Sequence, residues 1–215
     1  MNRVKEKILS ERLIVIVRGV GKDKLIPLAE ALYAGGVRLT EITYGAGAPD
    51  GETAEGIRSL CEHMNGRMDI GAGTVLSELQ VRLTAEAGGK FIISPNTNKD
   101  VIEATREAGL VSVPAGLTPT EIEAAYEYGA DFVKLFPAAA MGPSYVKAVR
   151  APLPHVPLLA VGGIDLCSLA DYAKAGVCGF GICGSIVDRK LIDAGDFEAI
   201  ARLAEKYVSA VRELF

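Results

Sequence analysis

Lys134 is the residue whose position most clearly suggests chemistry. It lies in the middle of an apolar run, Phe132-Val-Lys-Leu-Phe136, that ends at Pro137. Burial penalises the charged ammonium group and lowers its pKa, and a neutral amine can attack a ketone to form an imine. The ordinary pKa is near 10.4, and a fall of about three pH units would make a large fraction of the amine reactive. The alternative is a lysine that extends from the strand end to solvent.

Glu41 is the second candidate. Alternation along the run Leu39-Thr-Glu-Ile-Thr43 puts Leu39, Glu41 and Thr43 on one face of a strand. A carboxyl group enclosed in a protein interior has a raised pKa and can transfer protons. We expect either this role or a purely structural ion pair between Glu41 and Lys134.

Small residues follow several apolar runs and are suited to binding an anion. In Gly71-Ala-Gly73-Thr74 the glycines let a ligand approach the backbone, and Thr74 adds a hydroxyl group and an amide. Arg18 follows another run and could hold a carboxylate or a phosphate with two hydrogen bonds. The pairs Gly162-Gly163 and Gly184-Ser185 indicate turns whose backbone N–H groups bind phosphate.

Other chemistries find little support. The stretch Gly179-Phe-Gly-Ile-Cys-Gly184 matches G-x-G-x-x-G, but a dinucleotide-binding motif opens the first βαβ unit, and this one lies near the C-terminus. The chain has two histidines and four cysteines, without a Cys-x-x-Cys pair. A dedicated zinc site and a histidine-based triad are therefore not expected, and the cysteines are expected to be reduced and mostly buried.

These residues must be positioned by short strands. Eight apolar runs predict strands, at Leu13–Val17, Leu39–Thr43, Asp69–Gly73, Phe91–Ser94, Val111–Ala115, Phe132–Phe136, Leu158–Val161 and Gly179–Ile182. Apolar residues at helical spacing separate the runs, and a further helix is expected at Arg3–Ser10. Strands that alternate with helices pair in parallel. We therefore expect an α/β protein, a (β/α)8 TIM barrel with an extra N-terminal helix, with a doubly wound open sheet as the alternative. In a barrel, active sites lie at the C-terminal ends of the strands.

The predicted helices carry recognisable ends. Capping boxes are expected at Ser77–Gln80 and Thr118–Glu121, the second with Pro119 at the first helical position. Left-handed glycines are expected to end five helices, at Gly35, Gly88, Gly109, Gly129 and Gly176.

The composition is that of a globular protein. The chain has 215 residues, 49% hydrophobic and 23% charged, with a net charge of −4. Without a linker or a composition break, residues 1–215 are expected to form one domain. The acidic balance argues against nucleic-acid binding. The longest apolar run near the N-terminus, Leu13–Val17, is too short for a membrane span or a signal peptide, so we expect a cytoplasmic protein without a membrane partner.

Together these pieces resemble the class I aldolases that split 2-keto-3-deoxy-6-phospho sugar acids, together with 4-hydroxy-2-oxoglutarate aldolase. The resemblance covers nearly the whole chain and rests on Glu41-Ile-Thr43, Gly71-Ala-Gly-Thr-Val-Leu76, Ile93-Ser-Pro95, Phe132-Val-Lys-Leu-Phe-Pro137, Val161-Gly-Gly-Ile164 and Gly184-Ser185. It implies a (β/α)8 barrel, commonly a homotrimer, that acts on a small molecule and needs no metal or other cofactor.

The resemblance also implies residue roles. Lys134 would form the imine, and Glu41 would take the 4-hydroxyl proton and then return a proton to the pyruvate enamine. Binding of the keto acid is implied for Thr74, Arg18, Gly73 and Pro95, and binding of the phosphate for Gly162, Gly163, Gly184 and Ser185. The products would be pyruvate and glyceraldehyde 3-phosphate, or pyruvate and glyoxylate from 4-hydroxy-2-oxoglutarate.

Two positions depart from the phosphogluconate-type members. Gly45 stands where they have an arginine that binds the carboxylate, and Val161 where they tend to have threonine. The phosphogalactonate-type members are closer, since they lack that arginine and share Arg18-Gly19 and Gly142-Pro-Ser-Tyr-Val-Lys-Ala148. Because threonine is absent from position 161, we expect the enzyme either to accept both 4-epimers or to prefer the phosphogalactonate epimer.

Two other functions fit the same residues. In a phosphosugar isomerase or epimerase, Lys134 would act only through its charge, and pyruvate with borohydride would not label it. In a non-catalytic barrel that binds a phospho-sugar acid, Lys134→Ala would largely preserve binding.

Overall fold

The computed structural model describes residues 3–45 and 48–215, and within them the chain forms nine strands and ten helices. The strands are β1 (Leu13–Val17), β2 (Leu39–Thr43), β3 (Asp69–Gly73), β4 (Phe91–Ile93), β5 (Val111–Val113), β6 (Ala115–Gly116), β7 (Val133–Leu135), β8 (Leu158–Val161) and β9 (Gly179–Ile182). The helices are α1 (Arg3–Glu11), α2 (Lys22–Ala34), α3 (Asp50–Met64), α4 (Glu78–Glu86), α5 (Lys99–Glu107), α6 (Pro119–Glu127), α7 (Ala138–Arg150), α8 (Leu169–Ala175), α9 (Arg189–Ala194) and α10 (Phe197–Arg212).

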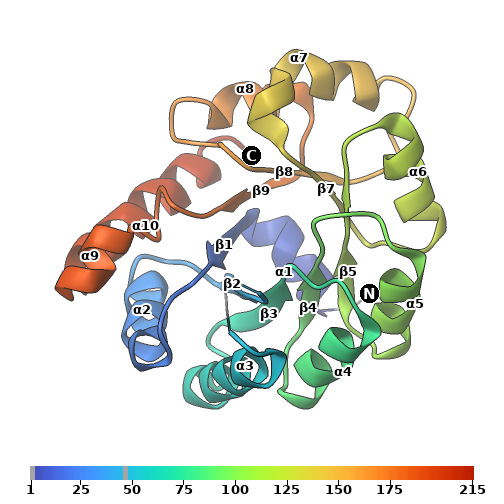
Figure 1. Ribbon diagram of the computed structural model, residues 1–215. Helices are drawn as coiled ribbons and strands as arrows, with labels where there is room; N and C mark the ends of the chain where they lie inside the picture. The colour runs from blue at the N-terminus through green and yellow to red at the C-terminus, as the bar shows by residue number, and fades with distance from the viewer. Residues whose placement is uncertain (1–2, 46–47) are drawn as a thin grey trace.

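The strands close into a barrel surrounded by helices (Figure 1). Their order is β5-β4-β3-β2-β1-β9-β8-β7-β6, and every pairing is parallel. The two ends of this order, β5 and β6, are consecutive pieces of chain separated by Pro114. The N–H of Lys134 donates to the carbonyl of Pro114 at 2.8 Å, which continues the pairing across the gap. The (β/α)8 barrel is confirmed, and the open sheet is wrong.

Most predicted strand boundaries are reproduced. The fifth strand, expected as Val111–Ala115, is instead split at Pro114 and reaches Gly116. Proline has no N–H to donate to a neighbouring strand, which explains the interruption. Phe91–Ser94 ends one residue earlier, at Ile93, and Phe132–Phe136 is shortened at both ends to Val133–Leu135.

The helix ends largely follow the local sequence. Thr118 and Glu121 form the full capping box. Ser77 accepts from the N–H of Gln80, but the Gln80 side chain accepts from Leu76 rather than from Ser77, so the second box is incomplete. Four of the predicted glycine caps are left-handed, namely Gly88, Gly109, Gly129 and Gly176.

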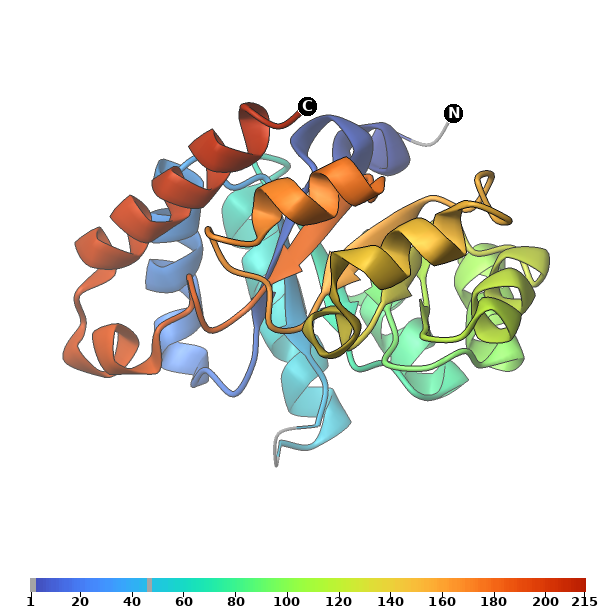
Figure 2. The ribbon, with the colours of Figure 1, turned by 90° about the horizontal axis from the view of Figure 1, so that it is seen from above.

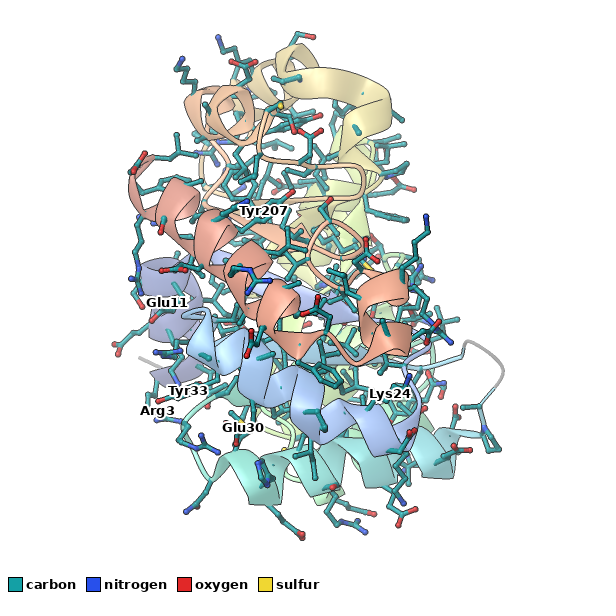
Figure 3. The ribbon with its side chains drawn as sticks, turned by 90° about the vertical axis from the view of Figure 1, so that its left-hand side faces the viewer. Arg3, Glu11, Lys24, Glu30, Tyr33 and Tyr207 are labelled. Carbon is teal, nitrogen blue, oxygen red and sulfur yellow. The ribbon has the colours of Figure 1, made fainter. Side chains whose placement is uncertain are left out.

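Gly35 is the exception among the predicted caps. Its φ is −74°, and the left-handed residue is Gly36, with φ 91°. A Cβ atom at Gly35 would lie 2.5 Å from the Ala204 Cβ of α10. Gly35 therefore permits a close approach between helices. Figure 3 shows α10, which carries Tyr207, lying along α2, which carries Glu30 and Tyr33. The C-terminal helix thus packs on the barrel's own helical layer.

The barrel interior is filled by apolar side chains and closed by α1. Val4 and Ile8 of α1 join the interior cluster that includes Leu39, Phe91 and Phe132. Asp69, 2% exposed, holds α1 in place through ion pairs with Arg3 at 3.0 Å and Lys7 at 2.7 Å. Figure 2 shows α1 and the C-terminus on the same side of the molecule. The opposite end of the barrel is left for the site. None of the helices in residues 3–45 and 48–215 has the length and apolarity of a membrane span.

Candidate active site

Lys134 lies inside the barrel wall. It is the middle residue of β7 and is 5% exposed, so the lysine that extends into solvent is wrong. Its Nζ atom lies 4.4 Å from the ring centre of Phe136, two residues along the chain. Burial lowers the pKa of Lys134, the negative charge of Glu41 opposes this effect, and the positive charge of Arg18 adds to it. The neutral amine that an imine requires is thereby favoured.

Glu41 is enclosed even more completely. The residue is 2% exposed in β2, and burial raises its pKa to about 7, against the opposing influence of the positive charges of Lys134 and Arg18. Its Oε2 atom has no hydrogen-bond partner among the described residues. Glu41 and Lys134 therefore influence each other through space without a direct ion pair, and the purely structural pair is wrong. A carboxyl group with a pKa near neutrality can both accept and return a proton.

The glycines of β3 make room for other side chains. A Cβ atom at Gly73 would lie 1.7 Å from Oε2 of Glu41, and one at Gly71 would lie 2.4 Å from the Phe91 ring. The space beside Gly73, which we expected a ligand to use, is thus filled by the Glu41 carboxylate. Thr43, two residues after Glu41, is buried with a hydroxyl oxygen that has no hydrogen-bond partner in the described chain. The sequence reasoning did not select Thr43, although alternation placed it on this face.

Thr74 and Pro95 lie at the same end of the barrel. Thr74 directly follows β3 and adopts the left-handed region, with φ 54°. Pro95 follows β4, and both residues are half-buried. Neither lines the cavity that contains Lys134. The structure therefore places them at the strand ends, outside the lining of that cavity.

One cavity gathers most of the other predicted residues. It has a volume of about 290 Å³. Its lining includes Lys134, Arg18, Gly162, Gly163, Gly184 and Ser185. The lining also includes Val161, the position that the resemblance linked to the choice of 4-epimer. Phe136 and Cys183 line it too, and neither was predicted as a site residue. Phe136 could have been found, because it follows Lys134 by two residues and so lies on the same face of the strand.

The glycine turns of this cavity offer unpaired donors. Gly162 and Gly163 have φ values of 94° and 75°, so two successive residues adopt a conformation that favours glycine. In the part of the chain that the structure describes, the N–H groups of Gly163, Ile164 and Ser185 have no protein acceptor. With the exposed Arg18 on the same cavity, these donors form a place suited to an anion.

Gly45 leaves its surroundings open. Among the described residues, a Cβ atom there would meet no atom within 4 Å, and Gly45 lines a second cavity, of about 300 Å³, together with Thr43 and Lys22. Lys22 is already paired with Glu55 at 2.7 Å. Within the described chain, no group of three or more His, Cys, Asp or Glu side chains is placed to hold a metal ion.

Nearly the whole chain is similar to aldolases. A family model described as KDPG and KHG aldolase matches residues 4–203. The probable 2-dehydro-3-deoxy-6-phosphogalactonate aldolase of Rhizobium meliloti is 36% identical over 207 residues, which cover 95% of each chain. A solved structure described as native KDPGal superimposes with a TM-score of 0.85 at 33% identity, over 94% of this chain and 95% of that one. The Legionella pneumophila KDPG aldolase, solved with pyruvate captured as a covalent carbinolamine intermediate, gives 0.83 at 26% identity, over 94% and 96%.

Proposed function

Because this chain belongs to the KDPG and KHG aldolase family, we propose that it splits a 2-keto-3-deoxy-6-phospho sugar acid through an imine on Lys134. The family consists of lyases, and the class I reaction gives pyruvate and an aldehyde, here glyceraldehyde 3-phosphate. The observation that carries the assignment is the placement of Lys134, a buried amine with a lowered pKa that lines a cavity.

Lys134 supplies the electron sink for the reaction. Its neutral amine adds to the C2 ketone of the substrate, and loss of water leaves an iminium group. The electron pair of the breaking C3–C4 bond moves into this iminium, which gives the enamine of pyruvate. Arg18 favours the neutral amine before the reaction by its positive charge.

Glu41 supports both proton transfers. As a carboxylate it takes the proton of the 4-hydroxyl group while the C3–C4 bond breaks and the aldehyde forms. The resulting carboxylic acid then returns a proton to C3 of the enamine, after which water releases pyruvate from Lys134. The pKa near 7 suits this alternation, because neither protonation state is strongly favoured at neutral pH.

The two anionic ends of the substrate need separate partners. For the phosphate we propose the turns at Gly162-Gly163 and Gly184-Ser185, because their cavity presents unpaired N–H groups. Arg18 lines that cavity, and we propose that it binds the phosphate in place of the keto acid that the resemblance implied. For the carboxylate we propose Thr74 and neighbouring backbone amides, with Gly73 and Pro95 shaping that side.

The substrate range follows from the same site. We propose that the phosphogalactonate epimer is accepted at least as well as the phosphogluconate epimer, because Val161 offers no hydroxyl group to the 4-position. Cleavage of 4-hydroxy-2-oxoglutarate to pyruvate and glyoxylate needs the same lysine and glutamate but leaves the phosphate turns unused.

Imine trapping tests the assignment directly. The protein is incubated with pyruvate and borohydride, and its peptides are mapped by mass spectrometry. We expect a reduced pyruvate adduct on Lys134, none in Lys134→Ala, and normal labelling in Lys147→Ala, which removes an exposed lysine of α7. A wild-type protein that cleaves phospho-sugar acids without any adduct on Lys134 would overturn the mechanism.

The wider organisation of the protein is also a proposal. We propose a single domain over residues 1–215, a homotrimer by resemblance to the family, and a cytoplasmic location. Light scattering after size-exclusion chromatography measures the subunit number, and a monomer at the concentrations used for kinetics would contradict the trimer.

A further inference from the structure

We propose that Tyr172 is a positioning residue for the phosphate turn at Gly162-Gly163, a role that rests on the function proposed above. Tyr172 belongs to α8, which lies beside α7 (Figure 1), and is 3% exposed. Its hydroxyl group donates a buried hydrogen bond of 2.9 Å to the carbonyl of Ala138, the first residue of α7. Tyr172 lines neither of the two cavities described above.

The first turn of α7 is partly independent of the rest of the helix. Gly142 has φ 76° and ψ 169°, values outside the helical region, and the next residue is Pro143. Proline cannot donate the hydrogen bond that the carbonyl of Ala139 would receive in a continuous helix. The turn at residues 138–141 is therefore weakly held by the body of α7, and the hydrogen bond from Tyr172 is a direct link between this turn and α8.

This short turn packs on the phosphate turn. The N–H of Ala139 donates to the carbonyl of Gly162 at 3.0 Å. A Cβ atom at Gly163 would lie 2.5 Å from the Cβ of Ala139, so the two backbones are in close contact. A displacement of Ala138 is thereby passed to Ala139 and then to the Gly162 peptide.

The hydrogen bonds from Tyr172 to Ala138 and from Ala139 to Gly162 connect α8 to the N–H groups that we propose bind the phosphate. The N–H groups of Gly163 and Ile164 have no protein acceptor in the described chain, and both residues line the cavity of Lys134. Loss of the Tyr172 hydroxyl would leave the Ala138 carbonyl without this partner in a buried position, which is unfavourable and would allow the turn to shift. The Lys134 side chain is carried by β7 itself, so imine formation should not depend on Tyr172.

Aldol addition of pyruvate to two acceptors tests the assignment. Glyceraldehyde 3-phosphate needs the phosphate turn, whereas glyceraldehyde is the same acceptor without the phosphate. For Tyr172→Phe we expect the KM for glyceraldehyde 3-phosphate to rise about five- to tenfold. A change of this size corresponds to the free energy of one lost hydrogen bond. With glyceraldehyde, kcat/KM should stay within about twofold of the wild type. Trapping of pyruvate on Lys134 should be unchanged.

Tyr145→Phe is a matched control. The Tyr145 hydroxyl also donates to a backbone carbonyl, that of Leu117 at 2.6 Å, but Tyr145 lies beyond the kink in α7. We expect it to leave the preference for the phosphorylated acceptor intact. Three results would overturn the role of Tyr172: an unchanged KM, an equal loss with both acceptors, or the same selective loss in Tyr145→Phe. If the wild type itself shows no preference for the phosphorylated acceptor, the proposed phosphate site fails, and the role of Tyr172 fails with it.

Discussion

The carboxylate of Glu41 occupies the space in which a side chain at residue 73 would lie. A Cβ atom at Gly73 would be 1.7 Å from Oε2 of Glu41 and 2.2 Å from its Cδ. The two residues belong to neighbouring strands, since β2 pairs with β3 along its whole length. Gly73 is therefore required by the position of the proposed acid–base group. The glycine-rich end of β3 and the glutamate of β2 act as one unit.

Gly73→Ala should displace Glu41 and inactivate the enzyme. The methyl group cannot occupy the same space as the carboxylate, so Glu41 must rotate away from its position beside Gly73. We expect kcat for cleavage to fall at least about a hundredfold, the scale of a lost general base. Steady-state kinetics measure this effect, and trapping of pyruvate on Lys134 reports whether the barrel remains intact. Full activity in Gly73→Ala would show that the carboxylate position is not critical.

Glu41→Gln should separate imine formation from bond cleavage. Glutamine keeps the shape of the side chain but cannot accept the 4-hydroxyl proton, so kcat should fall about 10²- to 10⁴-fold. In the wild type, kcat/KM should rise with pH towards about 7, as Glu41 becomes a carboxylate. In the variant the contribution of Glu41 to this limb should be lost, which leaves only the deprotonation of Lys134. A variant that keeps both the rate and the limb would assign the proton transfers to another group.

The same carboxyl group should make folding stability depend on pH. The pKa of Glu41 is about 7 in the folded protein, against an ordinary value of 4.5 that represents the unfolded chain. Below 4.5 the group is neutral in both states. Between pH 4.5 and 7 the unfolded chain gives up the proton while the folded protein keeps it, so the folded state becomes less stable relative to the unfolded state. Above pH 7 the folded protein holds a buried charge, and the stability that a neutral Glu41 provides at low pH has been lost.

Denaturation of wild type and Glu41→Gln at two pH values measures that loss. Between about pH 5 and about pH 8, the stability of the variant should gain about 2 to 3 kcal/mol relative to the wild type. Glu213→Gln changes an exposed carboxylate at the end of the chain and should show no such trend. A constant difference between Glu41→Gln and wild type would mean that Glu41 keeps an ordinary pKa.

Val161→Thr should change the choice between 4-epimers. Val161 is 4% exposed at the end of β8 and lines the cavity of Lys134. Threonine has nearly the same volume and adds a hydroxyl group that can bond the 4-hydroxyl of the substrate. We expect the ratio of kcat/KM for the phosphogluconate epimer to kcat/KM for the phosphogalactonate epimer to rise about fivefold. This is the effect expected when one hydrogen bond is gained. A wild type that already strongly prefers phosphogluconate would contradict the role given to Val161.

Local patterns in the sequence predicted much of this architecture. Alternation along β2 placed Glu41 on one face with Leu39 and Thr43, and the apolar run around Lys134 predicted a strand that holds this lysine. Thr118 with Glu121 predicted a helix start that the structure reproduces. These predictions succeed because each depends on a few neighbouring residues and on backbone preferences that hold in most folds.

Predictions that depended on distant packing were less accurate. Gly35 was assigned a left-handed conformation from its place after a helix, whereas its actual role is to let α10 approach α2. Thr43 and Phe136 were not selected, because a strand pattern shows which way a side chain points but not what it meets there. The split at Pro114 joins two pieces of strand to different neighbours, a pairing that a single run of residues does not specify.

The sequence by itself determined the alternation of strands and helices, the strands that carry Glu41 and Lys134, and the glycine turns. Only the tertiary structure decided that Glu41 fills the place beside Gly73, that Arg18 shares a cavity with Lys134, and that Tyr172 reaches Ala138. The physical reason is the range of the interactions. Periodicity and capping act within a few residues, whereas closure of the barrel and close packing bring together side chains that are far apart along the chain.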